Sequence, residues 1–160
     1  MNTSPYDELK PLTRKRIRLL WQKANLGGTF SGEDAHFVQA MREHPEYADL
    51  WGHLDELSDE QIERDGTNPI MHINIHTTVE NQIANGDPPI TGETVQALMR
   101  QGLSRHEAIH RVGAVLTEEI YHILKDKRDY DQADYVRKLK QLVKPNPARL
   151  PRRKARGRYR

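Results

Sequence analysis

The sequence lacks cysteine, long apolar runs and several common catalytic motifs, and each absence argues against a class of protein. Without cysteine there is no disulfide bond, thiolate metal ligand, iron–sulfur cluster or cysteine nucleophile. No stretch has the roughly 18 consecutive apolar residues of a membrane-spanning helix, and the first residues lack the apolar run of a signal peptide. We therefore expect a soluble, cytoplasmic protein with no membrane partner.

Motifs of several enzyme classes are also missing. The chain contains no G-x-S-x-G, no phosphate-binding P-loop and no G-x-G-x-x-G. An enzyme site built on aspartate, glutamate or serine is therefore the weakest hypothesis.

Helical periodicity dominates what is present, and strand signals are nearly absent. Apolar residues recur at helical spacing in the segments 13–28, 31–44, 46–57, 68–86, 91–102, 104–127 and 131–143. The 160 residues correspond to one ordinary domain. We predict an all-α fold, a single bundle-like domain of six or seven helices over residues 1–143, with an acidic link at 58–68 and a flexible basic tail at 144–160.

Several helix boundaries are readable from the sequence. Asn68 and Pro69 are typical of a cap and first turn, and Asn85 with Gly86 is typical of a helix end. Capping boxes are predicted where Ser31 precedes Asp34 and where Ser104 precedes Glu107.

The string "HEAIH" at residues 106–110 matches the His-Glu-x-x-His pattern of zinc peptidases. Glu107, which would have to act on a metal-bound water, is better explained as the capping partner of Ser104. Leu116 stands where a metzincin has its third histidine. We therefore do not expect a typical His-Glu-x-x-His metallopeptidase, and whether the protein is an enzyme stays open.

Two pairs of histidines spaced four residues apart point to a metal site. His72 and His76 lie on one helix, and His106 and His110 lie on a later one, each pair on or beside the apolar face. Two such helices packed together bring up to four imidazoles to one seam, where they can bind a divalent transition metal such as zinc, iron, manganese or nickel. Glu80, one turn beyond His76, is a candidate oxygen ligand.

A second interpretation is that these histidines are core residues hydrogen-bonded to the backbone, with no metal. Each buried imidazole would then need its own polar partner. The remaining histidines have no comparable pairing, and we expect surface or capping roles for them: His36, His44, His53 and His122.

The strings "REHPEY", "NPIMHINIHTTVENQIANGDPP" and "GLSRHEAIHRVGAVLTEEIYHILKD" resemble the bacterial proteins of the DUF1841 family, a domain of unknown function. That family carries an Asn-Pro-x-x-His-x-x-x-His helix and a later Arg-His-Glu-x-x-His helix. The resemblance covers most of residues 30–125. It implies a small helical cytoplasmic protein with both histidine pairs as its signature, and it implies no activity.

Charge is distributed unevenly along the chain. Residues 144–160 hold eight basic side chains and no acid, which leaves 17 basic and 23 acidic side chains in the rest. An extended basic arm can neutralise phosphates without reading a base sequence. The alternative function is therefore an RNA- or DNA-associated module in which the histidines are structural, with these tail residues as contacts: Arg149, Arg152, Arg153, Lys154, Arg156, Arg158 and Arg160.

This alternative predicts that the full chain binds RNA or DNA at low salt, with an affinity that falls steeply as salt rises. Deleting residues 144–160 should abolish that binding in a fluorescence-anisotropy titration. A full-length chain that shows no affinity at low salt would exclude the alternative.

Overall fold

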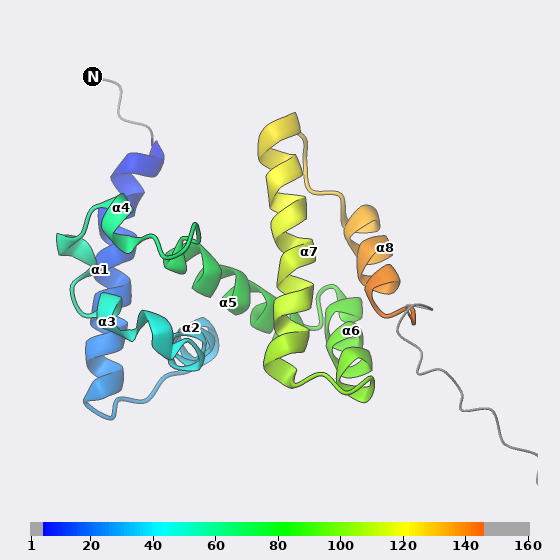
Figure 1. The fold of residues 1–160 in the computed structure, drawn as a ribbon, viewed down its shortest axis with the longest axis horizontal. Coiled ribbons are helices and arrows are strands. Elements are labelled where there is room, and N and C mark those ends of the chain that lie inside the picture. Colours follow the sequence, from blue (N-terminus) through cyan, green and yellow to red (C-terminus); the bar gives the residue numbers. More distant parts are fainter. Residues whose placement is uncertain (1–4, 146–160) are drawn as a thin grey trace, which may run out of the picture.

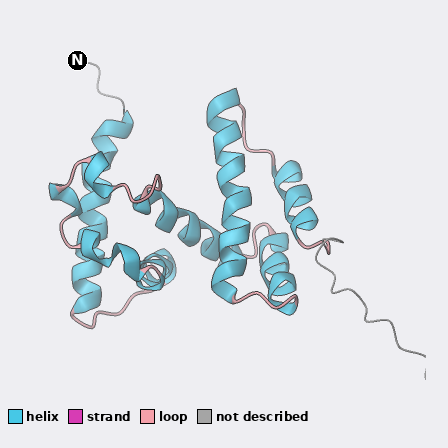
Figure 2. Ribbon diagram, viewed as in Figure 1, coloured by secondary structure: helices cyan, strands magenta, loops and turns pink. Residues whose placement is uncertain are grey.

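The computed structural model describes residues 5–145. Over these residues the chain forms only helices, together with one isolated bridge between Arg64 and Thr67 (Figure 2). The α-helices are α1 (Pro5–Asn25), α2 (Gly32–Glu43), α3 (Ala48–Trp51), α4 (Asp59–Ile62), α5 (Pro69–Asn85), α6 (Pro89–Arg100), α7 (Arg105–Asp126) and α8 (Gln132–Leu142), and the 3₁₀ helices are η1 (Pro45–Tyr47) and η2 (Leu54–Glu56). The predicted all-α fold is confirmed.

Two stretches differ locally from the prediction. The expected single helix at 46–57 is divided into η1, α3 and η2. The expected link at 58–68 contains the short helix α4, which begins with a capping box between Ser58 and Gln61. Ser-x-x-Gln is a helix-start signal of the same kind as Ser-x-x-Glu, and it explains why this acidic stretch is partly helical.

The predicted caps of the two histidine-bearing helices are present. The Asn68 side chain accepts hydrogen bonds from the backbone N–H groups of Ile70 and Met71, and Gly86 ends α5 with a left-handed backbone. At α7, Ser104 Oγ accepts from the Glu107 N–H at 3.2 Å, and Glu107 Oε2 accepts from the Ser104 N–H at 2.8 Å. These caps fix where each helix begins, and so they fix the direction in which its histidines project.

The predicted capping box at Ser31 is wrong. Ser31 precedes α2, but its side chain makes no capping hydrogen bond. The Asp34 carboxylate instead accepts a hydrogen bond from Arg16 on α1 at 2.6 Å. The Asp34 side chain therefore forms an ion pair with a different helix and does not take part in a capping box.

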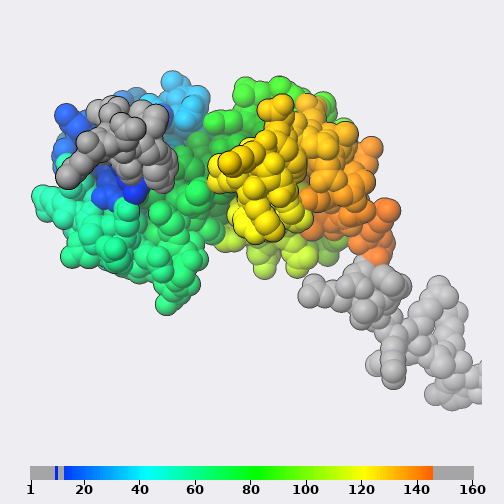
Figure 3. Space-filling view, turned by 90° about the horizontal axis from the view of Figure 1, so that it is seen from above, coloured from blue at the N-terminus to red at the C-terminus, as the bar shows by residue number. Residues whose placement is uncertain are grey.

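Two apolar clusters meet along α5. The first contains α1, α2 and the short helices, and the second contains α6, α7 and α8. Ile73 of α5 belongs to the first cluster, whereas Ile75 and Val79 belong to the second. Figure 1 shows α5 running between the two groups of helices. In the space-filling view of Figure 3, the blue-to-cyan residues of the first group and the yellow-to-orange residues of α7 and α8 lie on opposite sides of the molecule.

Helices α5 and α7 approach closely at Gly113. A Cβ atom added to Gly113 would lie 2.9 Å from Cγ2 of Ile75, closer than carbon atoms normally approach. Because Ile75 Cγ2 is attached directly to a branched, buried Cβ, it has little freedom to move away. The absence of a side chain at Gly113 therefore sets the spacing of the two histidine-bearing helices.

We expect Gly113→Ala to lower the free energy of unfolding by about 1 to 3 kcal/mol, because the added methyl group overpacks this contact. Gly92→Ala is a matched control within α6, since its Cβ would lie 3.8 Å from Ile83 Cγ2, an ordinary contact. That control should stabilise the protein by up to about 1 kcal/mol through helix propensity. Urea denaturation measures both, and equal stabilisation by the two substitutions would contradict the close packing.

Candidate metal centre

Five histidines from three helices gather at the line where the two apolar clusters meet. They are His44 at the end of α2, His72 and His76 on α5, and His106 and His110 on α7. Nine pairs of these rings have centroids only 4.5 to 5.6 Å apart. The structure thus brings together both sequence-predicted pairs and adds a fifth imidazole.

The sequence of α5 explains why its histidines lie at this line. On a helical wheel, His72 and His76 fall between Ile73 on one side and Ile75 and Val79 on the other. Since Ile73 packs in the first cluster and the other two pack in the second, the arc between them faces the junction. His76 is 3% exposed there.

His44 is the site residue that sequence reasoning missed, because it has no partner four residues away. It does cap the end of α2, one of the roles expected for it, but its side chain is only 1% exposed. Its Nδ1 lies 2.7 Å from the carbonyl oxygen of Ala40. A carbonyl only accepts, so Nδ1 donates its proton and Nε2 keeps the lone pair that a metal requires.

The Nε2 atoms of His44 and His72 are 2.9 Å apart. Without an ion this is a hydrogen bond between the rings. Two nitrogen ligands at about 2.0 to 2.1 Å from one ion would lie about 2.9 to 3.4 Å apart, for angles between the octahedral and tetrahedral values. The separation therefore matches that of two ligands on one ion.

Four histidines each present a potential ligand atom, all within 4.8 Å of one another: His44, His72, His76 and His110. A second group, whose potential ligand atoms also lie within 4.8 Å of one another, consists of Glu43, His76 and His106. In it the Glu43 carboxylate lies 3.5 Å from Nδ1 of His106. His106 is thus beside the four-histidine group rather than within it. The two groups share His76.

His76 has a buried Nε2 with no hydrogen-bond partner among the described residues. A buried polar atom left unpaired costs about 1 to 3 kcal/mol. Among the described residues this ring lacks the polar partner that the interpretation as a core histidine requires. An ion at the centre of the cluster would supply the missing partner.

Three of the imidazoles, those of His72, His76 and His110, have lowered pKa values that favour the neutral form. Burial, followed by the repulsion expected from the His44 ring, lowers the pKa of His72 to about 4. The same causes lower the pKa of His76 to about 2, and burial together with the neighbouring His106 lowers the pKa of His110. Neutral imidazole is the form that ligates metals.

Glu80, predicted as an oxygen ligand, is paired elsewhere. Its two carboxylate oxygens accept hydrogen bonds from the Arg105 guanidinium, one of them at 2.8 Å. Arg105 opens α7, and its bidentate contact holds the carboxylate beside α7 and outside both groups of potential ligands. The position of Glu80 on a helical wheel did not reveal that Arg105 would bind its carboxylate.

The peptidase-like features of α7 have structural roles. The Glu107 carboxylate is engaged by Ser104, and these hydrogen bonds lower the pKa of Glu107. Leu116 is buried in the second apolar cluster. Glu107 is therefore not free to act as the general base of a zinc peptidase.

The other three histidines lie apart from the cluster. His36 contacts Asn81 at 2.6 Å, His122 contacts Asp126 at 3.2 Å, and His53 is exposed. The seven basic residues expected to contact nucleic acid, Arg149 to Arg160, lie outside the described residues, so that expectation stays a prediction. No helix among the described residues is long and apolar enough to cross a membrane.

The lowered pKa values predict how acid affects the metal-free protein. Unfolded histidine binds a proton near pH 6.5, whereas folded His72 and His76 bind one only near pH 4 and 2. Between pH 6.5 and 5 the unfolded chain therefore binds more protons than the folded chain. As the pH falls through this range, the free energy of unfolding decreases by at most about 1.4 kcal/mol per pH unit for each such histidine. Above about pH 7.5 this contribution is complete and constant.

Denaturant titrations in the presence of a chelator measure this slope. His76→Gln, which cannot titrate, should show a shallower loss of stability between pH 6.5 and 5 than the unmodified chain. Equal slopes for the two proteins would contradict a neutral, buried His76.

Comparison with known proteins gives a family and no activity. Residues 11–141 match the family model described as "Domain of unknown function (DUF1841)". Searches of curated proteins and of solved structures returned no match. The match includes every helix that contributes to the histidine cluster, and the chain therefore belongs to the DUF1841 family.

Proposed function

We propose that the protein binds one divalent transition-metal ion through His44, His72, His76 and His110. The observation that carries the proposal is the convergence of four potential ligand atoms within 4.8 Å of one another, one of them from His76, whose buried Nε2 has no partner among the described residues. The 4.8 Å spread is wider than the roughly 3.4 Å of a closed tetrahedral shell. Small side-chain rotations that close the spread by about an ångström would complete the site.

Residues around the ligands support the proposal. The Ala40 carbonyl fixes the tautomer of His44, which is a common arrangement behind a metal-ligating histidine. Glu43 beside His106 supplies negative charge at the edge of the site. Similar partners recur at protein metal sites because they orient the imidazoles and balance the charge of the ion.

The donor set narrows the choice of metal. Imidazole suits zinc, copper, nickel and iron, whereas manganese and magnesium prefer carboxylates and water. With Glu80 held by Arg105, the four proposed ligands are all imidazoles. Zinc, nickel, copper and iron are therefore favoured over manganese.

The test is a calorimetric titration of the chelator-stripped full chain with zinc or nickel. We expect one ion per chain and a higher unfolding temperature in its presence, since an ion that binds the folded state stabilises it. His110→Ala should weaken binding by at least about tenfold. His110 is exposed, so this substitution should leave the fold intact.

His53→Ala is the matched control, because His53 is also exposed but lies outside the cluster. Glu80→Gln should also retain the affinity of the unmodified chain. If neither metal bound, or if His110→Ala and His53→Ala bound it equally, the proposal would be wrong.

A further inference from the structure

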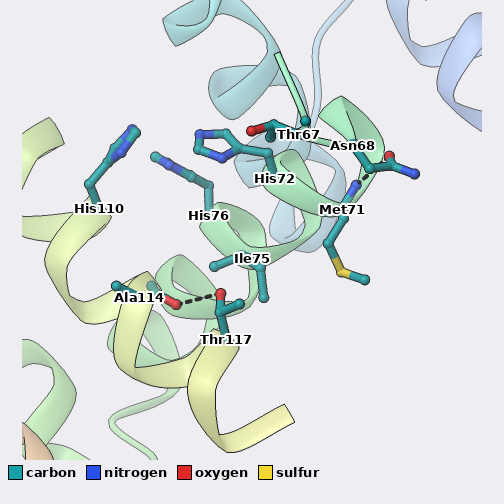
Figure 4. A pocket seen from close by; sticks show the side chains of 11 residues that line it. Thr67, Asn68, Met71, His72, Ile75, His76, His110, Ala114 and Thr117 are labelled. Carbon is teal, nitrogen blue, oxygen red and sulfur yellow. Dashed lines mark hydrogen bonds between the residues drawn. The ribbon is translucent and has the colours of Figure 1, made fainter. Parts of the chain in front are cut away.

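A cleft of about 500 Å³ opens beside the proposed metal site. His72, His76 and His110 lie at one end of it, and Ile75, Ala114 and Thr117 lie toward the other (Figure 4). Because three of the four proposed ligands line this cleft, an ion held by them is reachable from solvent. The volume is in the range of clefts that hold small organic molecules.

The walls of the cleft carry no formal charge. Apart from the histidines, they consist of small, apolar or neutral polar residues: Gly66, Thr67, Asn68, Met71, Ile75, Gly113, Ala114 and Thr117. The Thr117 hydroxyl donates to the Gly113 carbonyl, and the Asn68 side-chain oxygen is used in the cap of α5. The lining can therefore contact apolar parts of a ligand, but apart from the histidines it has no charged side chain to bind a ligand's charge.

Charge at the site favours a negative ligand. Four neutral imidazoles leave both positive charges of a divalent ion uncompensated. Glu43 is on the side of His106, where it also accepts a hydrogen bond from Gln39 at 2.9 Å, and it does not line the cleft. An anion that enters through the cleft would face the ion without a competing carboxylate in the wall.

We propose, on the basis of the metal site proposed above, that this cleft binds a small organic carboxylate. Its carboxylate oxygen ligates the ion as a fifth ligand beside the four imidazoles, and its aliphatic part lies against Met71, Ile75 and Ala114. The ion provides the attraction for charge, and the apolar wall provides the preference for a short hydrocarbon chain.

The test uses the full chain loaded with cobalt(II), whose visible absorption reports changes in its ligands. Butyrate should change the spectrum and bind about tenfold more tightly than acetate, because two more methylene groups are buried. Butylammonium should leave the spectrum unchanged. Ala114→Leu, which places a larger side chain in the cleft, should weaken butyrate binding by at least about tenfold while cobalt affinity is retained.

Ala133→Leu is the matched control, since Ala133 is exposed on α8 and does not line the cleft. It should bind cobalt and butyrate as the unmodified chain does. If cobalt binds but butyrate leaves its spectrum unchanged, or if both leucine variants bind butyrate equally, the carboxylate proposal is overturned and the metal site stands. If cobalt does not bind, the metal site itself fails.

Discussion

The burial of the His76 ring where two apolar clusters meet is the constraint on which the rest of this structure depends. Helix α5 contributes to both clusters, so the part of its surface between them is enclosed on both sides. The His76 imidazole in that position is only 3% exposed, and its Nε2 has no partner among the described residues. The surrounding rings of His44 and His110 are the groups best placed to share an ion with it.

An ion at this position would couple binding to folding. Its proposed ligands come from α2, α5 and α7, which are separated along the chain. Helix α2 packs in the first apolar cluster, α7 packs in the second, and α5 contributes to both. Coordination would therefore join the two halves of the molecule at their junction, and part of the binding free energy would appear as folding stability. The same junction opens to the cleft, so the ion would serve both as a structural link and as an accessible Lewis acid.

Much of the fold could be predicted because its signals are local. Periodic apolar residues and the caps at Asn68 and Ser104 define α5 and α7, and the spacing of each histidine pair places its rings on one face. What could not be predicted depends on contacts between distant segments. His44 is part of the string "REHPEY", but it joins the cluster only through the packing of α2 on α5. The Glu80 carboxylate is hydrogen-bonded to Arg105, which lies 25 residues further along the chain.

X-ray absorption spectroscopy at the edge of the bound metal tests the central claim most directly. For the zinc-loaded protein the account predicts nitrogen ligands at about 2.0 to 2.1 Å and the multiple-scattering pattern of several imidazole rings. A spectrum with oxygen ligands and no imidazole scattering would contradict it.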